Sequence, residues 1–237
     1  MIVDCAAYCD GHREGGLLSI SEAAAIAHTA ARDGNRRFVW LGLHDPSDDE
    51  FHEAVAAFGL DLAAGRDPAR QHPRPQLPGF SQDGEDHPTT LLLVLKPAWY
   101  VDPVEVVELG QLALFVTEHA VLSVRHGDSG PLTGARARLE HDPHQLAYGP
   151  TVVVASVLQH VVDEYVQVII DLEKDIDEIE ERVFDMTRAD HGERIFNLKR
   201  EVLDFRRAVE PLERPLRELA RGDVPVLDPA ATRVFVD

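Results

Sequence analysis

The stretch "YVQVIIDLEKDIDEIEERVFD", residues 165–185, combines an apolar stripe with a dense set of acids. The apolar residues recur at steps of three and four, at Tyr165, Val168, Ile169, Leu172, Ile176, Ile179 and Val183. This spacing places them on one face of a helix, which we expect to run from about residue 144 to 186, roughly 60 Å at 1.5 Å per residue. Residues 171–185 hold eight carboxylates against one lysine and one arginine. The sequence therefore predicts one long helix with an acidic distal half.

A second apolar stripe follows the polar break "MTRADHGE", residues 186–193. Its members are Ile195, Leu198, Val202, Phe205, Val209, Leu212, Leu216 and Leu219. Two stripes with a short connection are typical of an antiparallel helical hairpin. Residues 194–221 carry eight Lys or Arg against five acids, so the charge of the second helix complements that of the first. Pro211 and Pro215 are expected to bend or interrupt its second half.

The first 140 residues alternate between helical and strand patterns. The expected helices are 21–34, which begins at Ser21 and ends at Gly34, and 48–59. The expected strands are 36–43, the continuous apolar run 89–96, which we expect to be central in a sheet, and a pair within 111–127 joined near Glu118 and His119. Strands interleaved with helices indicate an α/β or α+β domain.

Composition limits the classes of partner. The chain has 237 residues, 44% of them hydrophobic, and a formal net charge of −19. Such a charge repels nucleic acid and anionic membrane surfaces and favours cationic partners, divalent metal ions included. Its longest apolar runs, 91–95 and 151–158, are shorter than a membrane helix requires, so we expect this chain to be soluble. Cys5 and Cys9 lack a zinc-site spacing and are interpreted as reduced residues of a cytosolic protein.

The motifs of common enzyme classes are absent. The sequence contains no G-x-x-x-x-G-K-[ST], G-x-G-x-x-G, G-x-S-x-G or H-E-x-x-H pattern. The tripeptide "HDP" occurs at 44–46 and 141–143, and we interpret both as turn or cap elements rather than as His/Asp metal pairs. His160, near the apolar stripe, is interpreted as a packing histidine. We therefore predict no covalent catalysis.

The acidic helix itself has two interpretations. Its carboxylates can form a solvated face that pairs with Arg and Lys of the neighbouring helix, each exposed pair contributing little. Alternatively, they form a diffuse electrostatic attractor that raises the local concentration of cations without binding any one ion tightly.

Segments in order along the chain resemble the CorA family of divalent-cation channels. They are "RRFVWLGLHDPSDDEF", "FGLDLAAGRDPARQHPRPQ", "TTLLLVLKPAWY", "DPHQLAYGPTVVVASVLQHVVDEYVQVIIDLEKDIDEIEERVF" and "RIFNLKREVLDFRRAVEPLERPLREL". The resemblance covers nearly the whole chain and implies three parts. These are an α/β/α sandwich with a mixed sheet over 1–142, a long antiparallel helical hairpin over 143–222, and the start of a truncated stalk helix over 223–237.

The resemblance also implies a cellular setting. A CorA-like protein is a pentamer in the inner membrane of a prokaryote, anchored by two membrane helices that follow the stalk. Residues 1–237 would face the cytoplasm, sense intracellular divalent metal at protomer interfaces and gate the pore. No nucleic acid is expected as a partner.

The regulatory metal site of the family lies between protomers and uses two aspartates. Alignment of "FGLDLAAGRDPARQHPRP" with the family segment places Asp67 at the first position, and the second falls on Asp237. One or two carboxylates commonly hold Mg²⁺, and such a weak site suits millimolar sensing. Co²⁺, Ni²⁺ or Zn²⁺ are alternative ions. Arg66 and Gln159 stand where relatives have acids, which argues against a second metal at this interface.

Two alternatives stay open. The chain is also compatible with the cytoplasmic domain of a ZntB-type Zn²⁺ transporter, which shares the architecture. From a different class, it is compatible with a soluble scaffold whose helical hairpin binds a partner helix and which does not respond to divalent ions.

Overall fold

The structure, a computed structural model, describes residues 1–33, 36–60, 79–80, 90–127, 130–184, 192–222, 224, 226–228 and 231, with the backbone alone at 79–80 and 184. Its main sheet contains seven strands in the order β2-β1-β3-β9-β8-β5-β4. The strands are β1 (Ile2–Cys9), β2 (His12–Glu14), β3 (Arg37–His44), β4 (Gly79–Phe80), β5 (Thr90–Leu95), β8 (Gln111–Val116) and β9 (Ala120–His126). β3 and β9 pair in parallel, whereas the other neighbours are antiparallel. The expected mixed sheet is confirmed.

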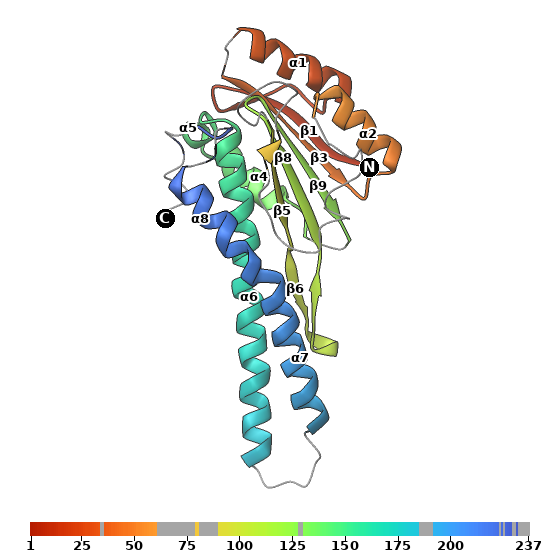
Figure 1. Cartoon of the computed structure of the whole chain (residues 1–237), viewed down its shortest axis with the longest axis vertical. Helices are drawn as coiled ribbons and strands as arrows, with labels where there is room; N and C mark the ends of the chain where they lie inside the picture. The colour runs from red at the N-terminus through yellow and green to blue at the C-terminus, as the bar shows by residue number, and fades with distance from the viewer. Residues whose placement is uncertain are drawn as a thin grey trace.

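Helices cover both faces of this sheet (Figure 1). One face carries α1 (Ile20–Asp33) and α2 (Asp48–Ala57); the other carries α4 (Thr133–Glu140), α5 (Pro143–Leu146) and α6 (Pro150–Phe184). Side chains alternate between the two cores because successive residues of a strand point to opposite faces. In β5, Leu91, Leu93 and Leu95 join the core under α6, while Leu92 and Val94 join the core under α1 and α2. The chain therefore forms the expected α/β/α sandwich.

The strand β5 does not lie where the sequence suggested. We expected the apolar run 89–96 to be central, but β5 is next to last, between β8 and the two-residue β4. All six of its residues are nevertheless buried. A continuous apolar run indicates that both faces of a strand are buried, but it does not indicate the position of the strand in the sheet. Here both faces of β5 are buried although it lies near the edge.

The long helix begins later than its apolar pattern suggested. We expected it to start near residue 144, but α5 ends at Leu146 and α6 starts at Pro150. Gly149 lies between them with φ 77°, a left-handed conformation that a continuing α-helix cannot include. Pro150 then occupies the first helical position, where its missing N–H leaves no hydrogen bond unmade.

The helical hairpin is confirmed and extends beyond the sheet (Figure 1). The returning segment consists of α7 (Gly192–Val209), the 3₁₀ turn Glu210–Leu212 and α8 (Glu213–Arg221). Pro211 lies in that turn, so the expected interruption occurs there, whereas Pro215 fits within the first turn of α8. A small hairpin of β6 (Ala98–Val101) and β7 (Val106–Leu109) packs against α6 and α7.

One described helix, α6, is long and apolar enough to cross a membrane by length and composition. Only part of its apolar surface is packed inside the protein. Val153, Val157 and Val161 are fully buried against the sheet, and Leu172 and Ile179 are buried further along, whereas Val166 and Ile170 are about half exposed. The packed face supplies most of the stability of the helix within this fold.

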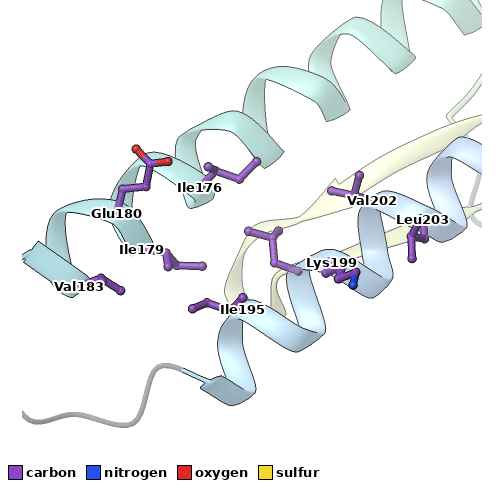
Figure 2. A pocket seen from close by; sticks show the side chains of 9 residues that line it. Ile176, Ile179, Glu180, Val183, Ile195, Lys199, Val202 and Leu203 are labelled. Carbon is purple, nitrogen blue, oxygen red and sulfur yellow. The ribbon is translucent and has the colours of Figure 1, made fainter.

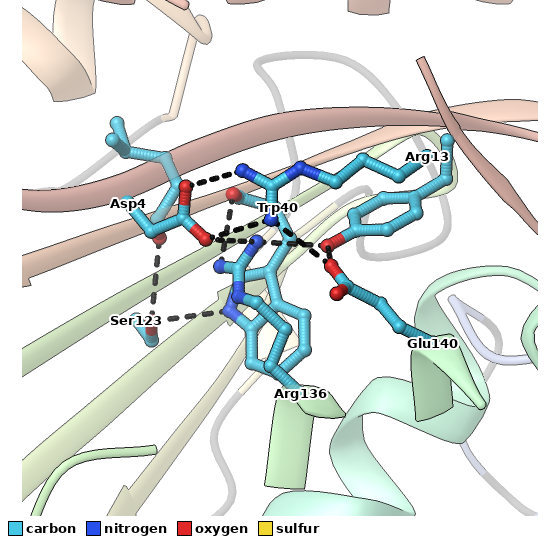
Figure 3. Close-up of polar contacts among 8 residues, drawn as sticks. Asp4, Arg13, Trp40, Ser123, Arg136 and Glu140 are labelled. Atoms are coloured by element: carbon cyan, nitrogen blue, oxygen red, sulfur yellow. Dashed lines mark hydrogen bonds and ion pairs between the residues drawn. The ribbon is translucent and has the colours of Figure 1, made fainter. Parts of the chain in front are cut away.

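The buried Arg136 of α4 binds residues of the sheet (Figure 3). The Arg136 guanidinium lies 4.0 Å from the centre of the Trp40 ring. Its Nη1 donates to the Tyr8 hydroxyl at 2.9 Å and lies 3.2 Å from an oxygen of Asp4, and its Nη2 donates to the Trp40 carbonyl at 3.2 Å. Arg13 also binds Asp4, at 2.8 Å, so that carboxylate is shared between two guanidiniums.

We predict that Arg136→Ala lowers the free energy of unfolding by about 3 kcal/mol, because it removes a buried cation and leaves its polar partners without their donor. Urea denaturation measures this. Arg138→Ala is the matched control on the same helix: its side chain is half exposed and 3.4 Å from Asp163, so its loss should cost less than about 0.5 kcal/mol. Equal losses in the two variants would contradict the role given to Arg136.

Candidate functional site

The two predicted metal ligands, Asp67 and Asp237, lie outside the described residues, as does Arg66. Gln159, the other position compared with the family pattern, is exposed on α6, where its amide donates to Asp163 at 2.7 Å. Among the described residues, no group of three or more His, Cys, Asp or Glu side chains is arranged to hold a metal ion. The assignment of Asp67 and Asp237 therefore stays a prediction.

The acidic half of α6 is the feature of the described chain most relevant to cations. Residues 171–184 contain seven carboxylates against Lys174 and Arg182, a formal net charge of −5. Four of the carboxylates are exposed: Glu173, Asp177, Glu180 and Glu181. They lie within the distal part of one helix, so their fields add in the surrounding water. An exposed set of this kind concentrates cations without enclosing one.

Arg194 of α7 neutralises part of this charge. Its Nε donates to Glu105 at 2.9 Å, and its Nη2 donates to Asp175 at 3.3 Å and to Glu178 at 3.2 Å. The bond to Glu105, followed by the other carboxylates, raises the pKa of Arg194 above its ordinary value despite partial burial. One guanidinium thus connects α7 to α6 and to the turn between β6 and β7. This finding supports the interpretation that the acids of α6 pair with bases of the neighbouring helix, but only for two of its carboxylates.

The β6–β7 hairpin supplies two further polar contacts. The Tyr100 hydroxyl donates to Asp175, a residue only 6% exposed. Burial, reinforced by this acidic neighbour, raises the pKa of Tyr100, so the phenol stays protonated as a donor. On the other side, the backbone N–H of Val107 donates to Glu201 of α7 at 3.1 Å. Each carboxylate that the hairpin buries is therefore hydrogen bonded.

An apolar groove of about 610 Å³ opens between the distal halves of α6 and α7 (Figure 2). Its lining is seven apolar side chains together with one acid and one base: Ile176, Ile179, Val183, Ile195, Leu198, Val202, Leu203, Glu180 and Lys199. Ile179 and Leu198 are buried, whereas Ile195 and Val183 are nearly half exposed. All of these apolar residues except Leu203 belong to the two stripes that we expected to form the contact between the helices. They fill the space between the helices only in part.

The two "HDP" tripeptides differ in role. Asp142 caps α5 by accepting from the Gln145 N–H at 3.1 Å, as the cap interpretation predicts. Asp45 follows β3 with φ 40° and accepts from Nδ1 of His126 at 3.1 Å. Partial burial works to raise the pKa of Asp45, but hydrogen bonds from His126 and Gly127 hold it below its ordinary value. The contact arises because β3 and β9 are parallel neighbours and both end here, which the sequence alone did not reveal.

A partly buried polar pair, His160 and Glu164, lies where α6 faces β9. Nε2 of His160 and Oε1 of Glu164 are 3.7 Å apart, beyond hydrogen-bond distance. Within the described part of the chain, His160 Nε2 and Glu164 Oε2 are buried without a hydrogen-bond partner. Burial raises the pKa of Glu164 to about 7, although the charge of Arg125 opposes the rise. Burial also lowers the pKa of His160, so this histidine packs as expected but does so neutral and unsatisfied.

A family model described as "CorA-like Mg2+ transporter protein" matches residues 35–237. The cobalt/magnesium transport protein CorA of Thermotoga maritima is 23% identical over 181 residues, which are 76% of this chain and 50% of that protein. The chain thus spans about half the length of this curated relative.

Two solved structures share the fold. The soluble domain of CorA from Methanocaldococcus jannaschii matches with a TM-score of 0.67 and 17% identity, over 100% of this chain and 87% of that one. The ZntB cytoplasmic domain from Vibrio parahaemolyticus matches with a TM-score of 0.53 and 13% identity, over 84% of this chain and 76% of that one. At these identities the likeness concerns the fold alone.

We predict that the buried carboxyl of Glu164 makes the protein less stable as pH rises. Because its pKa is about 7 in the folded chain against an ordinary 4.5, the folded state binds more protons between these values. Stability contributed by the protonated form is fully present below pH 4.5 and is lost as pH rises from there through 7. Glu164→Gln should therefore change the free energy of unfolding less at pH 5 than at pH 8, where it should raise it by about 2 kcal/mol.

Urea denaturation at the two pH values measures this difference. Glu173→Gln, an exposed change on the same helix, is the control and should leave the pH dependence as it is in the unaltered protein. A Glu164→Gln variant with unaltered pH dependence would show that this carboxyl is ionised throughout.

Proposed function

The chain belongs to the CorA-like Mg²⁺ transporter family, and from this premise we propose that it is the cytoplasmic regulatory part of a divalent-cation channel. It performs no covalent chemistry. Its task is to sense intracellular Mg²⁺, with Co²⁺ or Ni²⁺ as alternative ions, and to bias a pore carried by membrane helices of the whole protein. In this proposal residues 1–237 face the cytoplasm at the inner membrane of a prokaryote.

The observation that carries the proposal is the family match over residues 35–237, joined to the charge distribution of the hairpin. The exposed carboxylates of α6 give the domain a region where cations accumulate but are not enclosed. A sensor must release its ion when the cellular concentration falls, so weak binding is the property required. Mg²⁺ suits such a site because it keeps most of its waters and is commonly held by one or two carboxylates.

The sensing step is proposed to occur between copies of the chain. Carboxylates of neighbouring protomers, with Asp67 and Asp237 as the candidates, repel one another when no ion lies between them. A bound divalent cation removes that repulsion and holds a closed, symmetric ring, which we propose to be a pentamer. Loss of the ion releases the domains and shifts the pore toward its open state.

The ZntB-type alternative concerns the ion rather than the architecture. Zn²⁺ sites in proteins are usually built from three or four His, Cys or carboxylate ligands. Asp67 and Asp237 lie outside the described residues, so the choice of ion is supported by the comparisons: the family model is described as a Mg²⁺ transporter and the curated relative as a cobalt/magnesium transport protein. We therefore place Mg²⁺ before Zn²⁺. The scaffold alternative differs in predicting no response to divalent ions at all.

We predict that Mg²⁺ stabilises the protein against heat. An ion that binds only the folded state at ten times its dissociation constant adds about 1.4 kcal/mol, or about 3–6 °C in melting temperature for a chain of this size. Asp67→Ala should reduce the shift, because it removes a proposed ligand. Differential scanning calorimetry at constant ionic strength measures it.

Asp177→Ala is the matched control, since it removes one exposed acid of α6 and should leave most of the shift intact. A shift that falls equally in both variants would mean that Mg²⁺ acts through the diffuse charge of the domain. No shift in the unaltered chain would favour the scaffold alternative.

A further inference from the structure

The helical hairpin is covered on one side and open on the other. The β6–β7 hairpin contacts both helices, through Tyr100 to Asp175 of α6 and through Val107 to Glu201 of α7. Figure 2 shows strands behind the two helices, with the groove side chains in the space between them. The same groove exposes five apolar side chains by 37–49%: Ile176, Val183, Ile195, Val202 and Leu203. A contiguous apolar surface of this kind marks an interaction site.

Two charged residues line the groove, one on each helix. Among the described residues that line it, Glu180 of α6 is the one acid and Lys199 of α7 is the one base. Within the described part of the chain, neither makes an ion pair. Two other basic residues of these helices are paired: Arg182 lies 3.7 Å from Glu178, and Arg207 lies 3.0 Å from Asp204. The groove therefore presents one uncompensated charge of each sign, on opposite walls.

We propose that the groove is a contact surface for a second copy of this chain, in which Glu180 of one copy pairs with Lys199 of the other. The wall formed by α6 is acidic, with a net charge of −5 over residues 171–184. The wall formed by α7 is basic, with five Arg or Lys against three acids over 192–209. Packing α6 of one copy against α7 of the other brings opposite charges together and covers the exposed apolar side chains.

Self-complementarity selects a second copy over other occupants. A basic peptide would satisfy Glu180 but leave Lys199 against a like charge, and an acidic peptide would do the reverse. Another copy of the chain carries both Glu180 and Lys199 on one helical hairpin, and the distance between the two residues is the same in both copies. If two copies contact each other through both charges, they form a closed dimer. If each copy binds one neighbour through Glu180 and another through Lys199, the copies form a ring wherever the rotation between them closes. The inference rests on the homo-oligomer of the proposed function and names its contact surface.

The test is a charge exchange followed by sedimentation velocity over a concentration series of the full chain. Glu180→Lys and Lys199→Glu each place like charges opposite one another, and each should weaken self-association by about tenfold. The double variant Glu180→Lys/Lys199→Glu restores opposite charges in exchanged positions and should recover the affinity. Glu53→Lys, an exposed change of equal charge on α2, is the control and should associate like the unaltered chain.

Circular dichroism of each variant shows whether it is folded. Association that is unchanged by the single reversals, or that the double variant fails to restore, overturns the groove contact and leaves the proposed homo-oligomer standing. A chain that is monomeric throughout the series, with and without Mg²⁺, overturns both the contact and the proposed homo-oligomer.

Discussion

The apolar face of α6 is the constraint on which the rest of the structure depends. This helix is 35 residues long, and its buried side chains extend from Val152 to Ile179. An isolated helix gains little from its own hydrogen bonds, so this face must be covered along its length. The sheet covers the proximal half, and the distal half extends beyond it (Figure 1). The β6–β7 hairpin and the returning α7 pack against that distal half and cover part of it.

Covering the distal half of α6 buries two carboxylates. The hydrogen-bond partners of these carboxylates fix how the β6–β7 hairpin and α7 pack against the helix. Asp175 and Glu201 are each only 6% exposed. An unpaired buried carboxylate would be strongly destabilising, and here Tyr100, Arg194 and the Val107 N–H provide the partners. The acids that remain in water stay available for ions. Some carboxylates of this acidic helix stabilise the fold and others face solvent, and this division links the packing of the helix to the cation sensing that we propose.

The long helices were predictable because a 3.6-residue period survives over many turns. The late start of α6 at Pro150 was not, since the apolar pattern continues through the preceding segment; Gly149 was the available signal. Strand β1 was not predicted because its central residues 5–8, "CAAY", are buried on both faces and show no alternation of apolar and polar residues. The Asp45–His126 contact joins residues 81 apart, so only the parallel pairing of β3 and β9 could reveal it. Asp67 and Asp237 lie outside the described residues and stay predictions from the family resemblance.

Divalent cations are proposed to change how copies of this domain contact one another. Light scattering coupled to size-exclusion chromatography, across a Mg²⁺ titration at constant ionic strength, measures the mean molar mass directly. We expect the mass to rise along a saturable curve with a midpoint on the order of 1 mM. A mass that stays constant across the titration would show that Mg²⁺ does not bring copies of the domain together.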